Sequence, residues 1–275
     1  MRSELMSDLI SKFRETNKRL NRIFFGSDAN AYSHYLTLLE QSILLAQVVV
    51  DVGASSLALE DYLPNVGQPN ALFVAVDIDA SALKRNRSPA RVAADAEALP
   101  FGDETVDVLA VSCAFEHMGN PAPIFSEFYR VLKSDGRLVF VTPNRRCYIS
   151  IIARMTGLGF HRWVRMLQSG KSFEDANVWE TLYKVNTPAE LRRYGKSFGD
   201  LSLKTYMGAP TYTTFLPPAA HFAFILYHKL VQRVSWLRDL FGEIIVGCMT
   251  KSLTPGDASA AGALPESRHE PVRAQ

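Results

Sequence analysis

The chain has 275 residues, of which 47% are hydrophobic and 21% are charged, which suits a globular protein with a substantial core. Because the net charge is only +2, the molecule as a whole is not a binder of polyanions, and its local basic segments carry no nucleic-acid-reading module. The three cysteines lie far apart and lack metal-ligand spacing, which favours a reduced, intracellular setting and no metal site.

The first part of the chain is predicted to be helical. Residues 1–20 are charged throughout and contain no apolar signal-peptide core, so we expect a cytoplasmic protein. No apolar run reaches the roughly 20 residues that a membrane-spanning helix needs. Apolar residues recur at helical spacing on both sides of the break at 26–30, and residues 1–46 are therefore interpreted as an N-terminal helical cap.

From residue 47 onward, short apolar runs alternate with helix-like segments, as in βαβ units. The strands are predicted at 47–52, 72–77, 90–93, 106–112 and 137–142. Their near-continuous hydrophobicity is typical of parallel strands that are covered on both faces. Helices are predicted at 120–133, with Asn120 as N-cap, and at 187–197, which opens with a capping box. The fold class is α/β, with a doubly wound, mostly parallel sheet centred on residues 47–144.

The last third of the chain is predicted to complete the sheet and to add helices. Residues 201–207 and 243–250 have the pattern of a final strand pair, and a C-terminal helical insertion, 217–240, separates them. These elements belong to a region, 145–252, that follows the core. The tail, 253–275, is rich in Ala, Pro, Gly and Ser and has almost no large apolar residues, so we predict that it is disordered.

Acidic residues stand where the first strands end. Open α/β sheets bind ligands beyond the carboxyl ends of their strands, and here these ends carry Asp51 and Gly53, then Asp77 and Asp79. An acid after the second strand is positioned to accept hydrogen bonds from both hydroxyls of a ribose. An aspartate before a later helix, with a free amide beside it, is able to read the edge of an adenine. Together these groups describe a nucleoside site.

Four motifs carry a resemblance to a known family. "VVVDVGA", "VAVDIDASAL", "ADAEALPFGDETVDVLAVSCAFEHM" and "EFYRVLKSDGRLVFVTPN" resemble, in order and spacing, the class I S-adenosylmethionine-dependent methyltransferases, most closely the subgroup with quinone-biosynthesis and glycan-cluster enzymes. The resemblance covers about residues 47–144. It implies a Rossmann-like methyltransferase fold with S-adenosylmethionine as cofactor. By position it implies a cofactor site of Asp51, Gly53, Ser55, Asp77, Ile78, Asp95 and Ala96.

Within that implied site, Asp77 holds the ribose hydroxyls and Ile78 packs on the adenine, while Asp95 and the amide of Ala96 read the adenine edge. Gly53 and its neighbours lie against the methionine part. Asp79 is interpreted instead as the N-cap of the next helix.

The loop after the first strand departs from the family pattern. The family has glycines where this chain has Ser55 and Leu57, and a serine with positive φ costs about 1 kcal/mol or more. Leu57 is expected where a helix begins. Two hypotheses stay open: an active enzyme, and a catalytically silent relative that serves as a binding protein. A dinucleotide oxidoreductase is disfavoured, because residues 53–58 read GASSLA rather than G-x-G-x-x-G.

Methyl transfer needs few protein groups, since the cofactor carries the reactive carbon. If the acceptor is a hydroxyl, His117 is the best candidate for a base, although His117 and Glu116 are also suited to lining the pocket or holding a loop. We expect O-methylation of a hydroxyl or carboxyl group on a small-molecule, sugar or lipid-linked acceptor.

Specificity is expected outside the core. Segments 145–171 and 215–240 mix basic and apolar residues. This mixture suits a cap over the active site, a pocket for an acidic or lipid-linked acceptor, or peripheral contact with an anionic membrane surface.

Overall fold

The computed structural model describes residues 2–26, 31–63, 71–156 and 180–252. The predicted disordered tail, 253–275, lies outside the described residues, and so does the part of segment 145–171 that follows residue 156.

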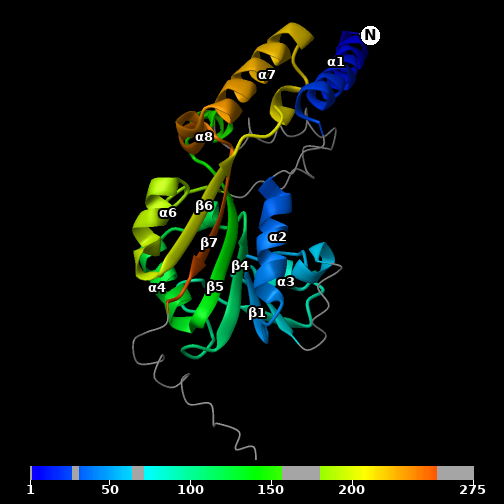
Figure 1. The fold of residues 1–275 in the computed structure, drawn as a ribbon. Helices are drawn as coiled ribbons and strands as arrows, with labels where there is room; N and C mark the ends of the chain where they lie inside the picture. The colour runs from blue at the N-terminus through cyan, green and yellow to red at the C-terminus, as the bar shows by residue number, and fades with distance from the viewer. Residues whose placement is uncertain (1, 27–30, 64–70, 157–179, 253–275) are drawn as a thin grey trace, which may run out of the picture.

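In the described residues the central element is a seven-stranded sheet with the strand order β3-β2-β1-β4-β5-β7-β6 (Figure 1). The strands are β1 (Val48–Val52), β2 (Leu72–Asp77), β3 (Ala90–Ala93), β4 (Val106–Ser112), β5 (Leu132–Pro143), β6 (Asp200–Tyr206) and β7 (Ile244–Thr250). The first five strands pair in parallel, whereas β7 runs antiparallel to both β5 and β6. The prediction of a mostly parallel sheet with a final antiparallel strand pair is confirmed.

The strand order reverses between β1 and β4. After β1 the chain adds β2 and then β3 on one side of β1. It then crosses back, and β4 pairs with the other side of β1. In the register, Asp51 lies opposite Ala75 of β2 and opposite Ala110 of β4, so the carboxyl ends of these three strands meet at one edge of the sheet. Such a switch point is where open α/β sheets bind ligands.

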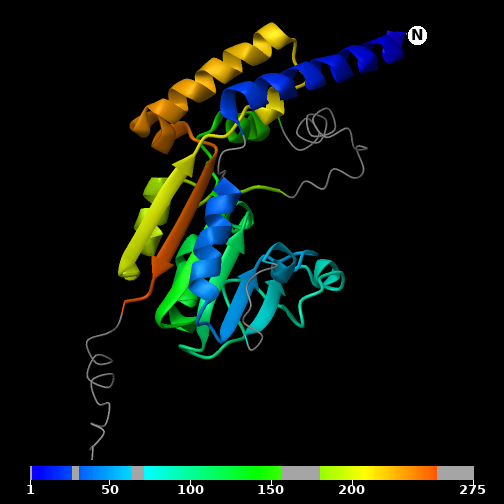
Figure 2. The same ribbon diagram turned by 45° about the vertical axis from the view of Figure 1, so that its right-hand side comes forward.

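Helices lie on both faces of this sheet and beyond one of its ends. Those whose bounds are described are α1 (Arg2–Phe25), α2 (Ala31–Ile43), α3 (Ala80–Leu83), α4 (Pro121–Val131), α6 (Pro188–Tyr194), α7 (Pro218–Arg233) and α8 (Ser235–Phe241). Helices α2 and α3 lie on one face, and α4 and α6 lie on the other (Figures 1 and 2). Helix α2 buries Tyr35, Leu39 and Ile43 at four-residue spacing, which places them on one side of the helix, against the sheet.

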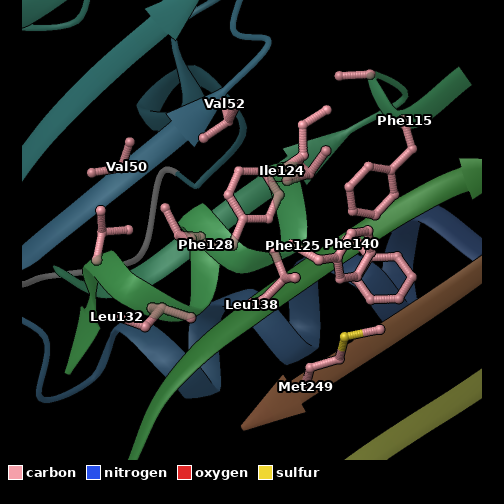
Figure 3. Packing of buried hydrophobic residues seen from close by; sticks show 14 of the residues in the cluster. Val50, Val52, Phe115, Ile124, Phe125, Phe128, Leu132, Leu138, Phe140 and Met249 are labelled. Carbon is pink, nitrogen blue, oxygen red and sulfur yellow. The ribbon is translucent and has the colours of Figure 1, made fainter. Parts of the chain in front are cut away.

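The opposite face is filled largely by aromatic residues. Phe125 and Phe128 of α4 pack with Phe115 and Phe140 above the strands, as Figure 3 shows. The rings of Phe115 and Phe140 meet edge to face, with 5.2 Å between their centroids. These side chains fix the turn after β4, which carries His117, against the rigid centre of the sheet.

The limits of α4 and β5 differ from the predicted ones. The side chain of Asn120 makes no capping hydrogen bond, although it occupies the predicted N-cap position before Pro121. The helix ends at Val131 because Leu132 already has extended backbone angles and begins β5, earlier than expected. By contrast, the predicted capping box of α6 is confirmed, because Thr187 Oγ1 accepts a hydrogen bond from the Glu190 amide.

Helices α1 and α7 lie side by side beyond one end of the sheet (Figures 1 and 2). The Asn17 side-chain amide donates to the carbonyl oxygens of Thr214 and Leu216, both at 2.8 Å, and thus ties α1 to the turn before α7. Helices α7 and α8 confirm the predicted helical insertion between β6 and β7. Within the described part of the chain, no helix is both long and apolar enough to cross a membrane.

Candidate active site

A cavity of about 630 Å³ opens at the switch point, bounded by the ends of β1, β2 and β4 and by α2. All eight residues that the sequence predicted for the site line this cavity: Asp51, Gly53, Ser55, Asp77, Ile78, Asp95, Ala96 and His117. The fold therefore brings together residues that are spread over 67 positions, from 51 to 117, along the chain.

The turn after β1 requires glycine for a steric reason. Gly53 has a φ of +79°, and a Cβ atom on it would lie 2.4 Å from the Cβ of Ala114. The amides of Gly53 and Ala54 both donate to the Val76 carbonyl oxygen, at 2.8 and 3.1 Å. The turn after β1 is therefore clamped between β2 and the segment after β4, whatever ligand occupies the cavity.

Ser55 also adopts the left-handed conformation, with a φ of 49°, so the expected strain at this position is present. Several hydrogen bonds offset this backbone strain at Ser55. The Ser55 amide donates to Asp77 Oδ2 at 2.8 Å, and the buried Asn86 side chain donates to the carbonyl oxygens of Ser55 and Leu57, at 3.1 and 2.8 Å. Sequence reasoning missed Asn86, because nothing in its own sequence surroundings marks it as a partner of this loop.

The expectation that Leu57 begins a helix is wrong. The chain forms a short 3₁₀ turn, Leu59–Tyr62, and Leu57 stays outside it with 56% of its surface exposed, at the cavity wall.

Asp77 and Asp79 differ in their partners. Asp77 Oδ1 accepts from the Asp79 amide and Oδ2 accepts from the Ser55 amide, both at 2.8 Å. A carboxylate offers about four acceptor positions, so each oxygen of Asp77 keeps one for the cavity. Asp79 Oδ1 accepts from the amides of Ser81 and Ala82, which confirms Asp79 as the N-cap of α3.

An apolar surface and two polar groups lie beyond Asp77. Ile78 leaves 75% of its surface exposed although it lines the cavity, so it presents an apolar face there. Asp95 Oδ1 accepts from the Glu97 amide at 3.0 Å and closes a tight turn. Among the described residues no acceptor lies at the Ala96 amide, which leaves this donor available to a ligand.

Asp51 lies at the other end of the cavity. It is only 8% exposed, and none of the described residues donates a hydrogen bond to its carboxylate. Burial, followed by the nearby charges of Glu60 and Asp77, raises the pKa of Asp51 to about 7. Two tyrosines of α2 that sequence reasoning missed, Tyr32 and Tyr35, line the same end.

The charge of the cavity has one sign. Its lining includes the acidic residues Asp51, Asp77, Asp79, Asp95, Glu97 and Glu180, whereas the described lining residues include no lysine or arginine. Such a surface attracts a cationic ligand and repels the phosphates of a dinucleotide. The acidic lining therefore disfavours binding of a dinucleotide, as do the missing glycines, and both observations argue against a dinucleotide oxidoreductase.

His117 holds a loop and also faces the cavity. The His117 Nδ1 atom lies 2.5 Å from the Glu180 carbonyl oxygen. Because a carbonyl oxygen only accepts hydrogen bonds, Nδ1 must be the donor. In the neutral ring the lone pair is then on Nε2. The carbonyl oxygen of Glu116 accepts from the amides of Leu182 and Tyr183. The buried Glu116 carboxyl, whose pKa is raised by burial, is hydrogen-bonded by Thr142 and does not line the cavity.

Comparison with known proteins identifies the family. A family model described as a methyltransferase domain matches residues 50–140. The malonyl-[acyl-carrier protein] O-methyltransferase of Methylococcus capsulatus is 32% identical over 205 residues, which cover 68% of this chain and 74% of that protein. The chain belongs to the class I S-adenosylmethionine-dependent methyltransferases. The resemblance inferred from the four motifs is thereby confirmed.

Other methyltransferases match over shorter spans or by fold alone. A demethylmenaquinone methyltransferase of a Mycobacterium species is 31% identical over 104 residues, 36% of this chain. This match spans 45% of that protein. The matches to several other curated relatives also span less than half of their lengths. A methyltransferase structure from Archaeoglobus fulgidus has a TM-score of 0.50 and 14% identity, covers 79% of this chain and 92% of its own, and shows the same fold.

The cofactor of this family is S-adenosylmethionine, and the cavity suits it. The cofactor carries a sulfonium and an ammonium group, and the described lining carries six acidic residues and no lysine or arginine; the buried carboxylate of Asp51 has no donor among the described residues. Its nucleoside part needs acceptors for ribose hydroxyls, an apolar surface and an amide donor, and the cavity presents groups of each kind. The residues of this methyltransferase therefore fit the group.

The pKa of Asp51 predicts a pH-dependent change in stability. In the unfolded chain Asp51 ionises above its ordinary pKa of 3.8, but in the folded chain it ionises only above about 7. The folded state thus binds the proton more tightly between these values, and the carboxyl lowers stability increasingly as the pH rises through this window. Replacing Asp51 by Asn should raise the unfolding temperature of the unliganded protein, by more at pH 8 than at pH 4, in thermal melts. An equal gain at both pH values would contradict the raised pKa.

Proposed function

We propose that the protein transfers the methyl group of S-adenosylmethionine to an oxygen atom, a hydroxyl or a carboxyl, of a small-molecule, carrier-linked or lipid-linked acceptor. The observation that carries the proposal is the acidic cavity at the switch point, with partnerless polar groups at both ends. The relative that matches the chain over most of its length, from Methylococcus capsulatus, is named an O-methyltransferase.

In this proposal the nucleoside lies beside β2. Asp77 accepts from the ribose hydroxyls through the acceptor positions that Ser55 and Asp79 leave open. Ile78 packs against the adenine. The Asp95 carboxylate and the Ala96 amide hydrogen-bond the adenine edge. The three hydrogen-bonding roles use groups of cavity-lining residues that keep capacity for a further hydrogen bond.

The methionine end lies over the turn after β1. Asp51 accepts from the ammonium group, which gives its buried charge a partner. Gly53 allows the turn to pass close to Ala114, and Ser55, which lines the cavity, lies beside the ligand in this proposal. Since Asn86 and Asp77 hold Ser55 in its positive-φ conformation, its departure from glycine is compatible with binding. This argues against the catalytically silent alternative.

The cofactor supplies an electrophilic methyl group on its sulfonium centre, and the protein supplies orientation and a proton acceptor. His117 is placed to accept the proton of an acceptor hydroxyl on Nε2, because Nδ1 is engaged with the Glu180 carbonyl oxygen. A carboxylate acceptor is already ionised at neutral pH and needs no base.

A second candidate is C-methylation of a quinone. Relatives from Mycobacterium and from Klebsiella pneumoniae are named quinone-biosynthesis methyltransferases. The product distinguishes oxygen from carbon acceptors. Alkaline hydrolysis releases methanol from a methyl ester but not from a methyl ether or a methylated ring, and the methyl chemical shift in NMR separates a methyl ether from a ring methyl group.

Two neighbouring aspartates offer a matched test of the cofactor site. Asp77→Asn should weaken binding of S-adenosylhomocysteine by about tenfold or more in calorimetry, because it removes a charged acceptor of two hydroxyls. Asp79→Asn should leave the affinity within about threefold, because Asp79 only caps α3 and asparagine also caps helices. Equal losses in both variants would contradict the assignment of Asp77. If the unaltered protein binds neither cofactor nor product at millimolar concentration, the silent alternative is favoured.

His117 is tested by turnover. With an oxygen acceptor that is un-ionised, His117→Ala should lower kcat by about 100-fold or more, the usual contribution of a general base, while leaving cofactor affinity nearly unchanged. His117→Gln serves as a control, because a glutamine amide can still donate to the Glu180 carbonyl oxygen. Recovery of full turnover in this variant would assign His117 a loop-holding role only.

We further propose peripheral contact with anionic membranes through the predicted segment 215–240. Phe222, Leu226 and Leu230 of α7 and Trp236 of α8 have exposed side chains. Basic residues lie among them: Lys229, Arg233 and Arg238. Exposed apolar side chains beside basic ones are typical of helices at a membrane surface.

This contact predicts that the protein floats with vesicles that contain anionic lipid at low salt, and less with neutral vesicles. Leu226→Glu should reduce the bound fraction several-fold, because it puts a negative charge into the apolar face. Leu45→Glu, an exposed leucine beyond α2 on another part of the molecule, is the matched control. Flotation that is absent, or that is equally reduced by both substitutions, would rule this surface out.

A further inference from the structure

Tyr35 of helix α2 lines the cavity and carries a buried hydroxyl group. The side chain is only 1% exposed, and its Oη makes no hydrogen bond with any of the described residues. Burial, and then the nearby Asp51, raise the pKa of Tyr35 well above its ordinary value. Tyr35 is therefore a neutral O–H donor at any physiological pH, and one whose burial without a partner destabilises the free protein.

The surroundings of this hydroxyl restrict what it binds. Asp51 lies near enough to raise the pKa of both Tyr35 and Tyr32. The Tyr32 hydroxyl is already hydrogen-bonded to Ser112 Oγ, at 2.7 Å. This end of the cavity thus holds one buried acidic acceptor and, near enough to feel its charge, one buried donor that has no partner among the described residues.

A free amino acid group matches this pair. It carries an ammonium, which an acidic acceptor attracts, and a carboxylate, which needs donors. Because the described lining residues include no lysine or arginine, the carboxylate has to be met by neutral donors. Tyr35 Oη is such a donor, and it is buried where a hydrogen bond to a charged group is strong.

We propose that Tyr35 is a cofactor-binding residue whose hydroxyl donates to the carboxylate of the amino acid end of S-adenosylmethionine. The assignment rests on the proposed function. It makes α2, which lies before the methyltransferase motifs in the sequence, part of the cofactor site. The helix is suited to this role because Leu39 and Ile43, on the same face as Tyr35, anchor it to the sheet.

The test is Tyr35→Phe, which removes the hydroxyl alone. Binding of S-adenosylhomocysteine, measured by calorimetry, should weaken by about tenfold or more, as expected for a hydrogen bond to a charged group. Binding of decarboxylated S-adenosylmethionine, which lacks the carboxylate, should be the same for the variant and the unaltered protein within about twofold. The unliganded variant should melt at the same or a higher temperature, because a buried hydroxyl without a partner has been removed.

The matched control is Tyr62→Phe, a tyrosine that also lines the cavity but is exposed to water. It should change both affinities by less than about threefold. Equal weakening for the two ligands in Tyr35→Phe, or no weakening for either, would overturn the role of Tyr35 while leaving the proposed function standing. A clear drop in the melting temperature of the unliganded variant would also overturn it, because the hydroxyl would then have a structural partner. Failure of the unaltered protein to bind any of these ligands would overturn the proposed function instead.

Discussion

The geometry of the site depends on the carboxylate of Asp77. It stands at the end of β2 and accepts hydrogen bonds from two loops, from Ser55 after β1 and from Asp79 before α3. Charge-assisted bonds of this kind are stronger than neutral ones. They hold the Ser55 backbone in a conformation that serine disfavours by about 1 kcal/mol, so the same side chain shapes the loop and keeps capacity for a ligand.

Around this junction the cavity collects polar groups that the protein leaves unsatisfied. Among the described residues, Asp51 has no hydrogen-bond donor, Tyr35 Oη has no partner, and the Ala96 amide has no acceptor. Each such group lowers the stability of the free protein by an amount that a ligand with complementary charges and hydrogen bonds would recover. Most buried polar groups in proteins are paired, so the buried side chains of Asp51 and Tyr35, which line one cavity, support a role in binding there.

The strands of the core were predictable because parallel strands that are buried on both faces leave long apolar runs, as in Val106–Ser112. The seven residues proposed for the cofactor site were inferred from the resemblance to the family, and they lie at or just after the carboxyl ends of β1, β2 and β3, where the strand order brings them together. Asn86, Tyr32 and Tyr35 were not predictable. Their roles depend on which way a helix or loop folds back over the switch point, and their own neighbours in the sequence carry no trace of that contact. The 3₁₀ turn after Leu57 escaped prediction for the same reason.

The charge of the cavity explains why the loop after β1 functions without a glycine-rich sequence. Loops that cradle phosphates need several glycines, because successive backbone amides have to approach an anion closely. Here the cavity is acidic and suits a ligand whose reactive centre and ammonium are cationic, so side-chain carboxylates matter more than exposed backbone amides. In the loop after β1 the glycine at position 53 is sterically required, and Ala114 imposes that requirement. In a loop that binds an anion, Ser55 and Leu57 would keep the backbone amides away from the ligand. A site for a cationic ligand depends less on these amides and therefore tolerates both residues.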